Sequence, residues 1–307
     1  APLRPIALAA AVGLLGITAA GPAQAYCRTM TSRVRAQEGE CPMYGVALSW
    51  RNLCTGYSLY RANLPAGLTL PDMDRITASS TGAWGRVACD DNGREPQYYR
   101  IIPNGQTSNP TGYNPFGSNS NTVAFRPKWE DDSLHRPGTI AITVVTFDSL
   151  TGEIFDADIE LNSRAAANPG GFVFASARMP EPDECDLQTI LTHEFGHFLG
   201  LAHSNITRAV MYPTAGLGEI RSDLNSDDSA GICAIYPERA TPAGRCLGLP
   251  YGGLATTPGG ATVVGPNNVS CAVGHAPRGG ARSLCLAALA LATLARRRRG
   301  ALGVNRD

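Results

Sequence analysis

Residues 191–204 constrain this chain more than any other stretch, because they contain the pattern H-E-x-x-H-x-x-G-x-x-H. On a helix, His193 and His197 lie one turn apart, so both imidazoles leave the same face and can bind one metal ion. Glu194 follows the first histidine, and the helical period places it beside the metal, where a bound water would sit. The spacing therefore predicts a helix that carries both metal ligands and a base.

The glycine of the pattern predicts where this helix ends. We expect Gly200 to adopt a left-handed backbone conformation that terminates the helix and brings His203 back as a third ligand. The alternative is an ordinary amphipathic helix whose histidines only pack. However, the chain has five histidines and three of them stand here. A chance match at these spacings has a probability on the order of 10⁻⁵, so we favour the metal site.

Three neutral imidazoles with one open position are the ligand set of a catalytic zinc ion, since a structural zinc site is closed by four protein ligands. Zinc lowers the pKa of its bound water toward neutrality. Glu194 can accept the proton of that water and pass it to a leaving amine. The residues thus predict zinc-dependent hydrolysis of peptide bonds, with a protein or peptide as substrate.

The motif and its flanks resemble those of the matrixin-like branch of the metzincin zinc proteases. Ser204 follows the third histidine, as in that branch, and the sequence Ala-Val-Met-Tyr-Pro at 209–213 resembles its Met-turn. The resemblance implies three zinc ligands, a general base, and a methionine that underlies the metal without binding it. The implied zinc ligands are His193, His197 and His203. The implied general base is Glu194, and the methionine is Met211.

The same resemblance implies a fold and a substrate pocket. The fold class would be α/β (α+β), with a metzincin-type twisted mixed sheet, an active-site helix and a small C-terminal subdomain after Gly200. The loop 214–222 would line the pocket for the side chain after the scissile bond, with Tyr212, Pro213 and Thr214 as candidate pocket residues. The chain has no segment like the P-R-C-G type that keeps animal matrixins latent.

Two other functions remain open from the sequence. A catalytically silent surface-binding module would keep zinc only for structure, although zinc binding alone does not require Glu194. A different metzincin branch with narrower substrates would differ in the loop after Met211.

The two ends of the chain predict export and surface attachment. Residues 1–25 have an arginine, an apolar run and a final A-x-A, as a secretory signal peptide does. The protease domain is expected at 26–238, followed by a linker rich in Gly, Pro and Thr at 239–270. The tail, 271–307, resembles MYXO-CTERM sorting signals, with Cys271 as the processing site; a plain membrane anchor is the alternative. We expect membrane contact only through this tail.

The cysteines and the net charge indicate disulfide bonds and argue against one class of partner. Seven cysteines stand between residues 26 and 270, and after a signal peptide they favour disulfides. A bond between Cys185 and Cys233 is expected, because it would join the start of the active-site helix to the helix after the Met-turn. Without the eight arginines and one aspartate of the two ends, this segment has a net charge of −7. That balance argues against nucleic acid as a partner, and we expect a monomer.

The remaining pattern predicts the sheet and its surroundings. We expect a first strand within 26–71, where Trp50, Cys54 and the run 57–60 stand, a helix at 71–84 and a strand at 97–102. A surface loop at 103–121 and a hairpin from 139–147 and 153–161 should follow. Residues 172–174 are a candidate edge strand for substrate. One face of the second hairpin strand carries Asp156, Asp158 and Glu160. We expect that face to be solvated, with a Ca²⁺ site as the alternative.

Overall fold

The computed structural model describes 26–32, 40–51, 54–89, 99–114, 119–129, 135–136, 138–163, 171–176, 179–236 and the backbone of 261–262 and 270–274. The helices are α1 (Leu70–Gly85), α2 (Leu187–Phe198) and α3 (Ser226–Ile235). The first six strands are β1 (Cys27–Arg28), β2 (Cys54–Tyr60), β3 (Arg100–Thr107), β4 (Thr122–Arg126), β5 (Thr139–Asp148) and β6 (Ile154–Asn162). They are followed by β7 (Phe174–Ala175), β8 (Cys185–Asp186), β9 (Leu201–Ala202), β10 (Thr214–Gly216), β11 (Ala261–Thr262) and β12 (Ser270–Gly274).

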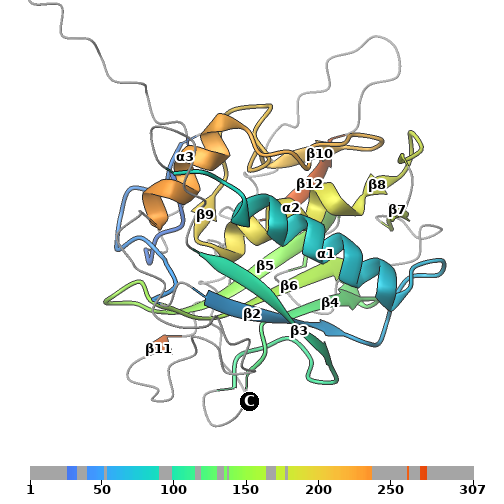
Figure 1. Ribbon diagram of the computed structural model, residues 1–307, viewed down its shortest axis with the longest axis horizontal. Helices are drawn as coiled ribbons and strands as arrows, with labels where there is room; N and C mark the ends of the chain where they lie inside the picture. Colours follow the sequence, from blue (N-terminus) through green and yellow to red (C-terminus); the bar gives the residue numbers. More distant parts are fainter. Residues whose placement is uncertain are drawn as a thin grey trace, which may run out of the picture. The chain divides into compact units, whose positions relative to one another are not determined.

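Five strands in the order β3-β2-β4-β6-β5 form the centre of one mixed sheet (Figure 1). The first four are parallel to their neighbours, whereas β5 runs antiparallel to β6 as the predicted hairpin. The sheet continues past β5 into β12, which is antiparallel to β5, and then into β10, which is parallel to β12. β11 also pairs with β5. The predicted α/β class with a mixed sheet is confirmed.

α1 and α2 lie against the same sheet (Figure 1), and buried polar contacts join them. Thr69 caps α1 in a capping box with Asp72. The indole nitrogen of Trp84 donates to the carbonyl of Thr192 on α2 (2.8 Å). On the sheet side, the ring of Phe195 meets Tyr57 of β2, with centroids 5.4 Å apart. The hydrophobic core therefore holds α2 in place from both sides.

The ends of α2 are set by three local features. Asp186 caps the N-terminus and accepts a hydrogen bond from the amide of Thr189 (2.8 Å). At the other end Gly200 has φ +99°, as the sequence predicts. A Cβ there would also lie 2.6 Å from the carbonyl oxygen of Leu48, so both space and backbone conformation favour glycine.

Disulfides tie the arm and α3 to this frame. Cys27 pairs with Cys41 in the N-terminal arm, and Cys89, just after α1, pairs with Cys233 on α3. Cys54 is also disulfide-bonded. The predicted bond between Cys185 and Cys233 is wrong, because Cys185 is a buried free thiol on β8. β8 pairs with β7 in a separate two-stranded sheet, so of the candidate edge strand 172–174 only Phe174 lies in a strand, and its pairing with substrate stays a prediction.

The acidic face of β6 is buried, so the prediction of a solvated face is wrong. Asp156, Asp158 and Glu160 are 2 %, 1 % and 3 % exposed. The predicted surface loop folds over them, and its Gly112 amide donates to Asp158, as does the amide of Thr122, the first residue of β4. Glu160 contacts Thr111, Arg126 and His135. The loop is rich in Gly, Pro and Asn and leaves backbone amides available as donors. Hydrogen bonds to charged acceptors offset the free-energy cost of burying the carboxylates.

The free energy of unfolding should depend on pH because the carboxyl groups on this face of β6 are buried. Burial, first, and the neighbouring Asp158 raise the pKa of Asp156 well above its ordinary value, and burial raises the pKa of Asp158 to about 7. Because both folded pKa values lie above the unfolded ones, the stabilisation is complete near pH 4 and is lost as pH rises through 7. We expect the Asp156→Asn variant to lose less stability between pH 5 and 8 than the parent, by on the order of 1 kcal/mol or more.

Urea unfolding at a series of pH values would measure this difference. Asp148→Asn is the control, because Asp148 is partly exposed and hydrogen bonds from the amides of Thr151 and Leu150 lower its pKa instead of raising it. An Asp156→Asn variant whose stability falls as steeply as that of the parent would contradict the assignment.

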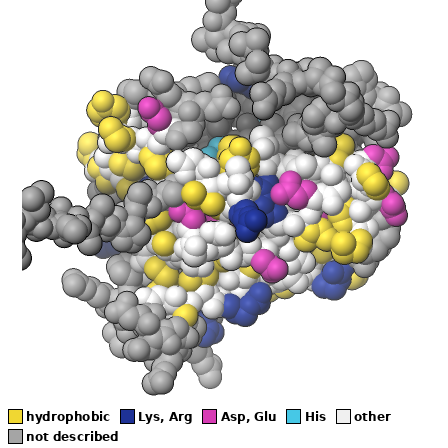
Figure 2. All heavy atoms as spheres, turned by 90° about the horizontal axis from the view of Figure 1, so that it is seen from above, with side chains coloured by type: hydrophobic (Ala, Val, Ile, Leu, Met, Phe, Trp, Pro, Cys, Tyr) yellow, Lys and Arg dark blue, Asp and Glu magenta, His cyan; other side chains and the backbone are white. Residues whose placement is uncertain are grey.

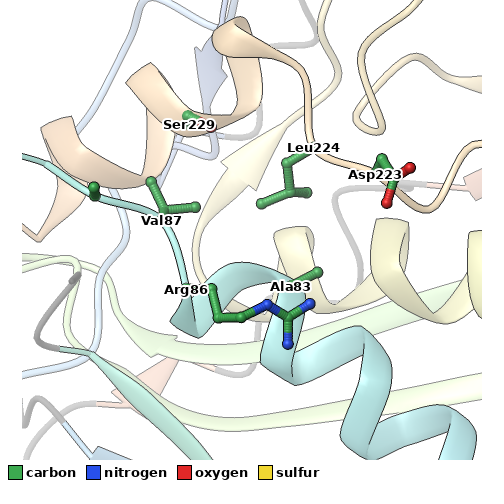
Figure 3. A pocket seen from close by; sticks show the side chains of 7 residues that line it. Ala83, Arg86, Val87, Asp223, Leu224 and Ser229 are labelled. Atoms are coloured by element: carbon green, nitrogen blue, oxygen red, sulfur yellow. The ribbon is translucent and has the colours of Figure 1, made fainter. Parts of the chain in front are cut away.

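A pocket of about 330 Å³ lies between the end of α1 and the segment that leads into α3 (Figure 3). Val87 and Leu224 face each other across it in Figure 3. None of its lining residues belongs to the histidine motif. In the described part of the chain, no helix has the length and apolarity needed to cross a membrane.

Candidate active site

The three histidines of the motif converge on one point. His193 and His197 project from α2, and His203 follows β9 after the turn at Gly200. One ring nitrogen from each lies within 4.8 Å of the others, and the Nε2 atoms of His193 and His197 are 2.9 Å apart. Among the described residues, no other group of three or more His, Cys, Asp or Glu side chains is arranged in this way.

Backbone carbonyls orient the two helical rings. Nδ1 of His193 donates to the carbonyl of Val210 (2.6 Å), and Nδ1 of His197 donates to the carbonyl of Leu201 (2.8 Å). With Nδ1 protonated, the neutral ring leaves an Nε2 lone pair for a ligand bond. Burial lowers the pKa of both histidines well below its ordinary value and lowers the pKa of His203 to about 4. All three rings are therefore neutral near pH 7.

These side chains fit a divalent metal ion. Nε2 of His203 is buried and has no hydrogen-bond partner among the described residues. A buried polar atom without a partner is costly, whereas a cation would satisfy this nitrogen together with the other two. Three imidazoles are a donor set that zinc accepts. Figure 2 shows a small histidine surface beside hydrophobic and uncharged atoms, and of the three clustered histidines only His203 is partly exposed.

Glu194 is fully buried and is held by the sheet. The hydroxyl of Thr143 on β5 lies 2.6 Å from Oε2 of Glu194 and 3.1 Å from its backbone carbonyl oxygen. This contact fixes the carboxylate of Glu194 beside β5. The sequence analysis missed Thr143, because a threonine in a β-branched run gives no signal beyond the strand itself.

Met211 packs tightly beneath the histidine helix. It is 2 % exposed, and a Cβ placed on Gly196 would lie 2.2 Å from its sulfur atom and 2.8 Å from the ring of Trp84. Gly196 stands between the two helical histidines, so only a glycine lets the Met-turn approach the helix here. Met211 therefore supports the helix at the level of its metal-facing residues.

The carboxylate of Asp228 on α3 holds the Met-turn. It accepts hydrogen bonds from the amides of Val210 (2.8 Å), Met211 (3.0 Å) and Asn225 (2.8 Å). Since Val210 in turn orients His193, Asp228 is one contact removed from the histidine cluster. Burial raises the pKa of Asp228, and its hydrogen bonds to the amides of Met211, Val210 and Asn225 oppose that rise. The N-cap pattern from Asn225 to Asp228 could have pointed to it, but the sequence analysis assigned it no role.

The candidate pocket residues directly follow Met211 in the chain. Tyr212 and Pro213 are partly buried, and Thr214 begins β10. The guanidinium of Arg221 lies 5.6 Å from the centre of the Tyr212 ring and also donates to the carbonyl of Thr214. Arg221 thus fixes the loop 214–222 against the Met-turn. The backbone of Cys271 lies in β12, which pairs with β10.

Comparison with known proteins agrees with this geometry. Residues 121–237 match the family model described as Matrixin. The matrixin-like segment includes β4 to β6, the histidine motif, the Met-turn and α3.

Individual relatives show the same local similarity. Metalloendoproteinase 2-MMP of Arabidopsis thaliana is 29 % identical over 121 residues, which are 39 % of this chain and 30 % of that protein. Human Matrilysin is 48 % identical over 50 residues, 16 % of this chain and 19 % of its own length. The matches thus span less than a third of the length of these curated relatives. They support a matrixin-like metalloprotease segment within a longer chain.

Proposed function

We propose that this chain is a zinc-dependent endopeptidase. The observation that carries the proposal is the convergence of three neutral imidazoles, one with an unsatisfied buried nitrogen, beside a carboxylate held by Thr143. His193, His197 and His203 would hold the ion. Zinc bound there supplies a polarised carbonyl and an acidified water.

The chain's own residues perform the other steps. Glu194 takes a proton from the attacking water and gives it to the leaving amine nitrogen, so the carboxylate is regenerated in each cycle. Thr143 keeps this carboxylate in one orientation. Val210 and Leu201 keep the imidazoles in the tautomer that leaves Nε2 available.

The substrate would be an extended protein or peptide segment. Tyr212, Pro213 and Thr214 would form part of the pocket wall, held by Arg221. The printed names of the relatives, metalloendoproteinases and a matrilysin, support the same reaction class.

Metal removal tests this function. With the purified chain and unfolded casein as substrate, we expect a zinc chelator to lower the rate of cleavage at least about 100-fold. Added zinc should restore the rate, while a chelator specific for calcium should leave it unchanged. Cleavage that survives zinc removal would overturn the proposal. A folded, zinc-loaded chain that cuts none of several unfolded proteins would favour the silent binding module.

We further propose that the protein is exported, with residues 1–25 removed and Cys271 as a sorting site. The support is the sequence pattern of the two ends together with the disulfides. Residues 1–25 and the tail after Gly274 lie outside the described residues. The mass of the mature protein from its native host would test this, since a chain that still begins before Tyr26 would contradict it. A Ca²⁺ site at the acidic face of β6, the alternative to a solvated face, stays untested.

A further inference from the structure

The edge of the sheet beside the histidine cluster is covered by a strand from late in the sequence. β12 runs antiparallel to β5, where Cys271 lies opposite Ala141. On its other side it runs parallel to β10, where Ala272 lies opposite Thr214. β12 therefore lies between β5 and β10 in the sheet (Figure 1), and we call the position that it occupies the groove, with β5 and β10 as its two walls.

Both walls of this groove carry residues of the candidate site. Ser270 lies opposite Ile142 on β5, and the next residue of β5 is Thr143, which contacts Glu194. β10 begins with Thr214, directly after the Met-turn and at the start of the predicted pocket loop. A chain segment that pairs with both walls must therefore pass directly beside the histidine cluster.

Backbone pairing of this kind is available to any extended segment. The groups of β5 and β10 that β12 uses are main-chain N–H and C=O groups, so an external peptide would pair with them by strand addition. β12 and an external peptide thus need the same groups and cannot bind together. Because β12 belongs to the same chain, its effective concentration is about millimolar, and it competes without any need for high intrinsic affinity.

We propose that Ser270–Gly274 is an internal ligand of the groove between β5 and β10, and that it holds the intact chain in a state of low activity toward external peptides. The inference rests on the proposed endopeptidase function and adds the regulation of that site. β12 has five residues, and its register with β5 is irregular between Cys271 and Ala272. A short, interrupted ladder opens more readily than a regular one, so the segment blocks the groove reversibly.

A proline at Ala272 tests the proposal in the full-length chain. Ala272 pairs with Thr139 on one side and Thr214 on the other, and proline both removes an N–H and disfavours a central strand. We expect Ala272→Pro to lower the KM for an external peptide about tenfold with kcat unchanged, because a competing internal ligand raises only the apparent KM. Ala255→Pro, outside the described residues, is the matched control, and Val273→Pro is the second variant if the first does not fold.

Amide hydrogen exchange of β5 supplies a readout that does not need catalysis. In a Glu194→Gln background we expect exchange of those amides at 140–142 that point toward β12 to become at least tenfold faster with Ala272→Pro and to stay unchanged with Ala255→Pro. A synthetic peptide of residues 268–276 should restore the slow exchange.

The two readouts separate the inference from the function on which it rests. Unchanged exchange and an unchanged KM in a chain that cleaves peptides would overturn the inference and leave the endopeptidase intact. Faster exchange in a chain that cleaves nothing, even with Ala272→Pro, would support the strand as the groove's ligand and overturn the endopeptidase.

Discussion

Replacing Glu194 with glutamine is expected to lower kcat/KM for peptide hydrolysis by about 10²–10⁴-fold while zinc stays bound. Glutamine keeps the size of the side chain and its contact with Thr143, but it cannot accept the proton of the attacking water. The imidazoles of His193 and His197 do not depend on Glu194 for their orientation, since the carbonyls of Val210 and Leu201 accept their Nδ1 hydrogen bonds. The variant should therefore separate metal binding from catalysis.

The measurement is the rate of cleavage of a fluorogenic peptide, with the zinc content of each preparation determined in parallel. Glu40→Gln is the control, because Glu40 is exposed and lies in the N-terminal arm. A Glu194→Gln variant that loses its zinc would show that the carboxylate supports the metal site itself. One that keeps full activity would rule out Glu194 as the base.

The largest loss of stability is expected from Asp228→Ala. The change leaves the buried amides of Val210 and Met211 without their acceptor, and each such loss costs about 1–3 kcal/mol. We therefore expect the free energy of unfolding to fall by about 2–5 kcal/mol. Since Val210 orients His193, zinc affinity should fall about 10–100-fold as well.

Chemical unfolding and zinc titration would measure the two effects separately. Asp223→Ala is the matched control, because Asp223 is exposed and stands in the segment just before α3. A loss of stability with unchanged zinc affinity would make Asp228 a purely structural residue. An unchanged free energy of unfolding would contradict its role in holding the Met-turn.

The helix and its histidines were predictable because their order in the sequence carries their geometry. A one-turn spacing places His193 and His197 on one face whatever surrounds the helix, and Gly200 marks the end because few other residues tolerate its φ. The hairpin of β5 and β6 was predictable for a similar reason, since a β-branched run, a turn and a second run are local signals.

The features that the sequence analysis missed depend on contacts between distant segments. Asp158 looked solvated because alternation along a strand shows which side chains share a face but not what covers that face. The amide of Gly112 that covers it comes from a loop with no periodic signal, and the amide of Thr122 comes from the first residue of a different strand, β4. Thr143 and Asp228 acquire their roles in the same way, by contacts across 51 and 18 residues of sequence.

The pairing of the cysteines could not be predicted from the order of the elements along the chain. A bond between Cys185 and Cys233 would have joined two elements that flank the site, yet Cys233 lies next to Cys89 at the end of α1. The choice depends on where α3 packs, which no local pattern encodes. β12 is similar, because a short stretch of small residues far beyond α3 gives no sign that it will enter the sheet.

The bond between Cys89 and Cys233 also bears on when the protein can become active. It closes a loop with a sequence separation of 144 residues, and this loop contains β4 to β6, the three histidines and the Met-turn. Closing a loop of that length restricts the unfolded chain enough to contribute about 5 kcal/mol to stability. In a reducing compartment the segment that carries the histidine cluster would lack that contribution, and oxidation of Cys89 and Cys233 would add it.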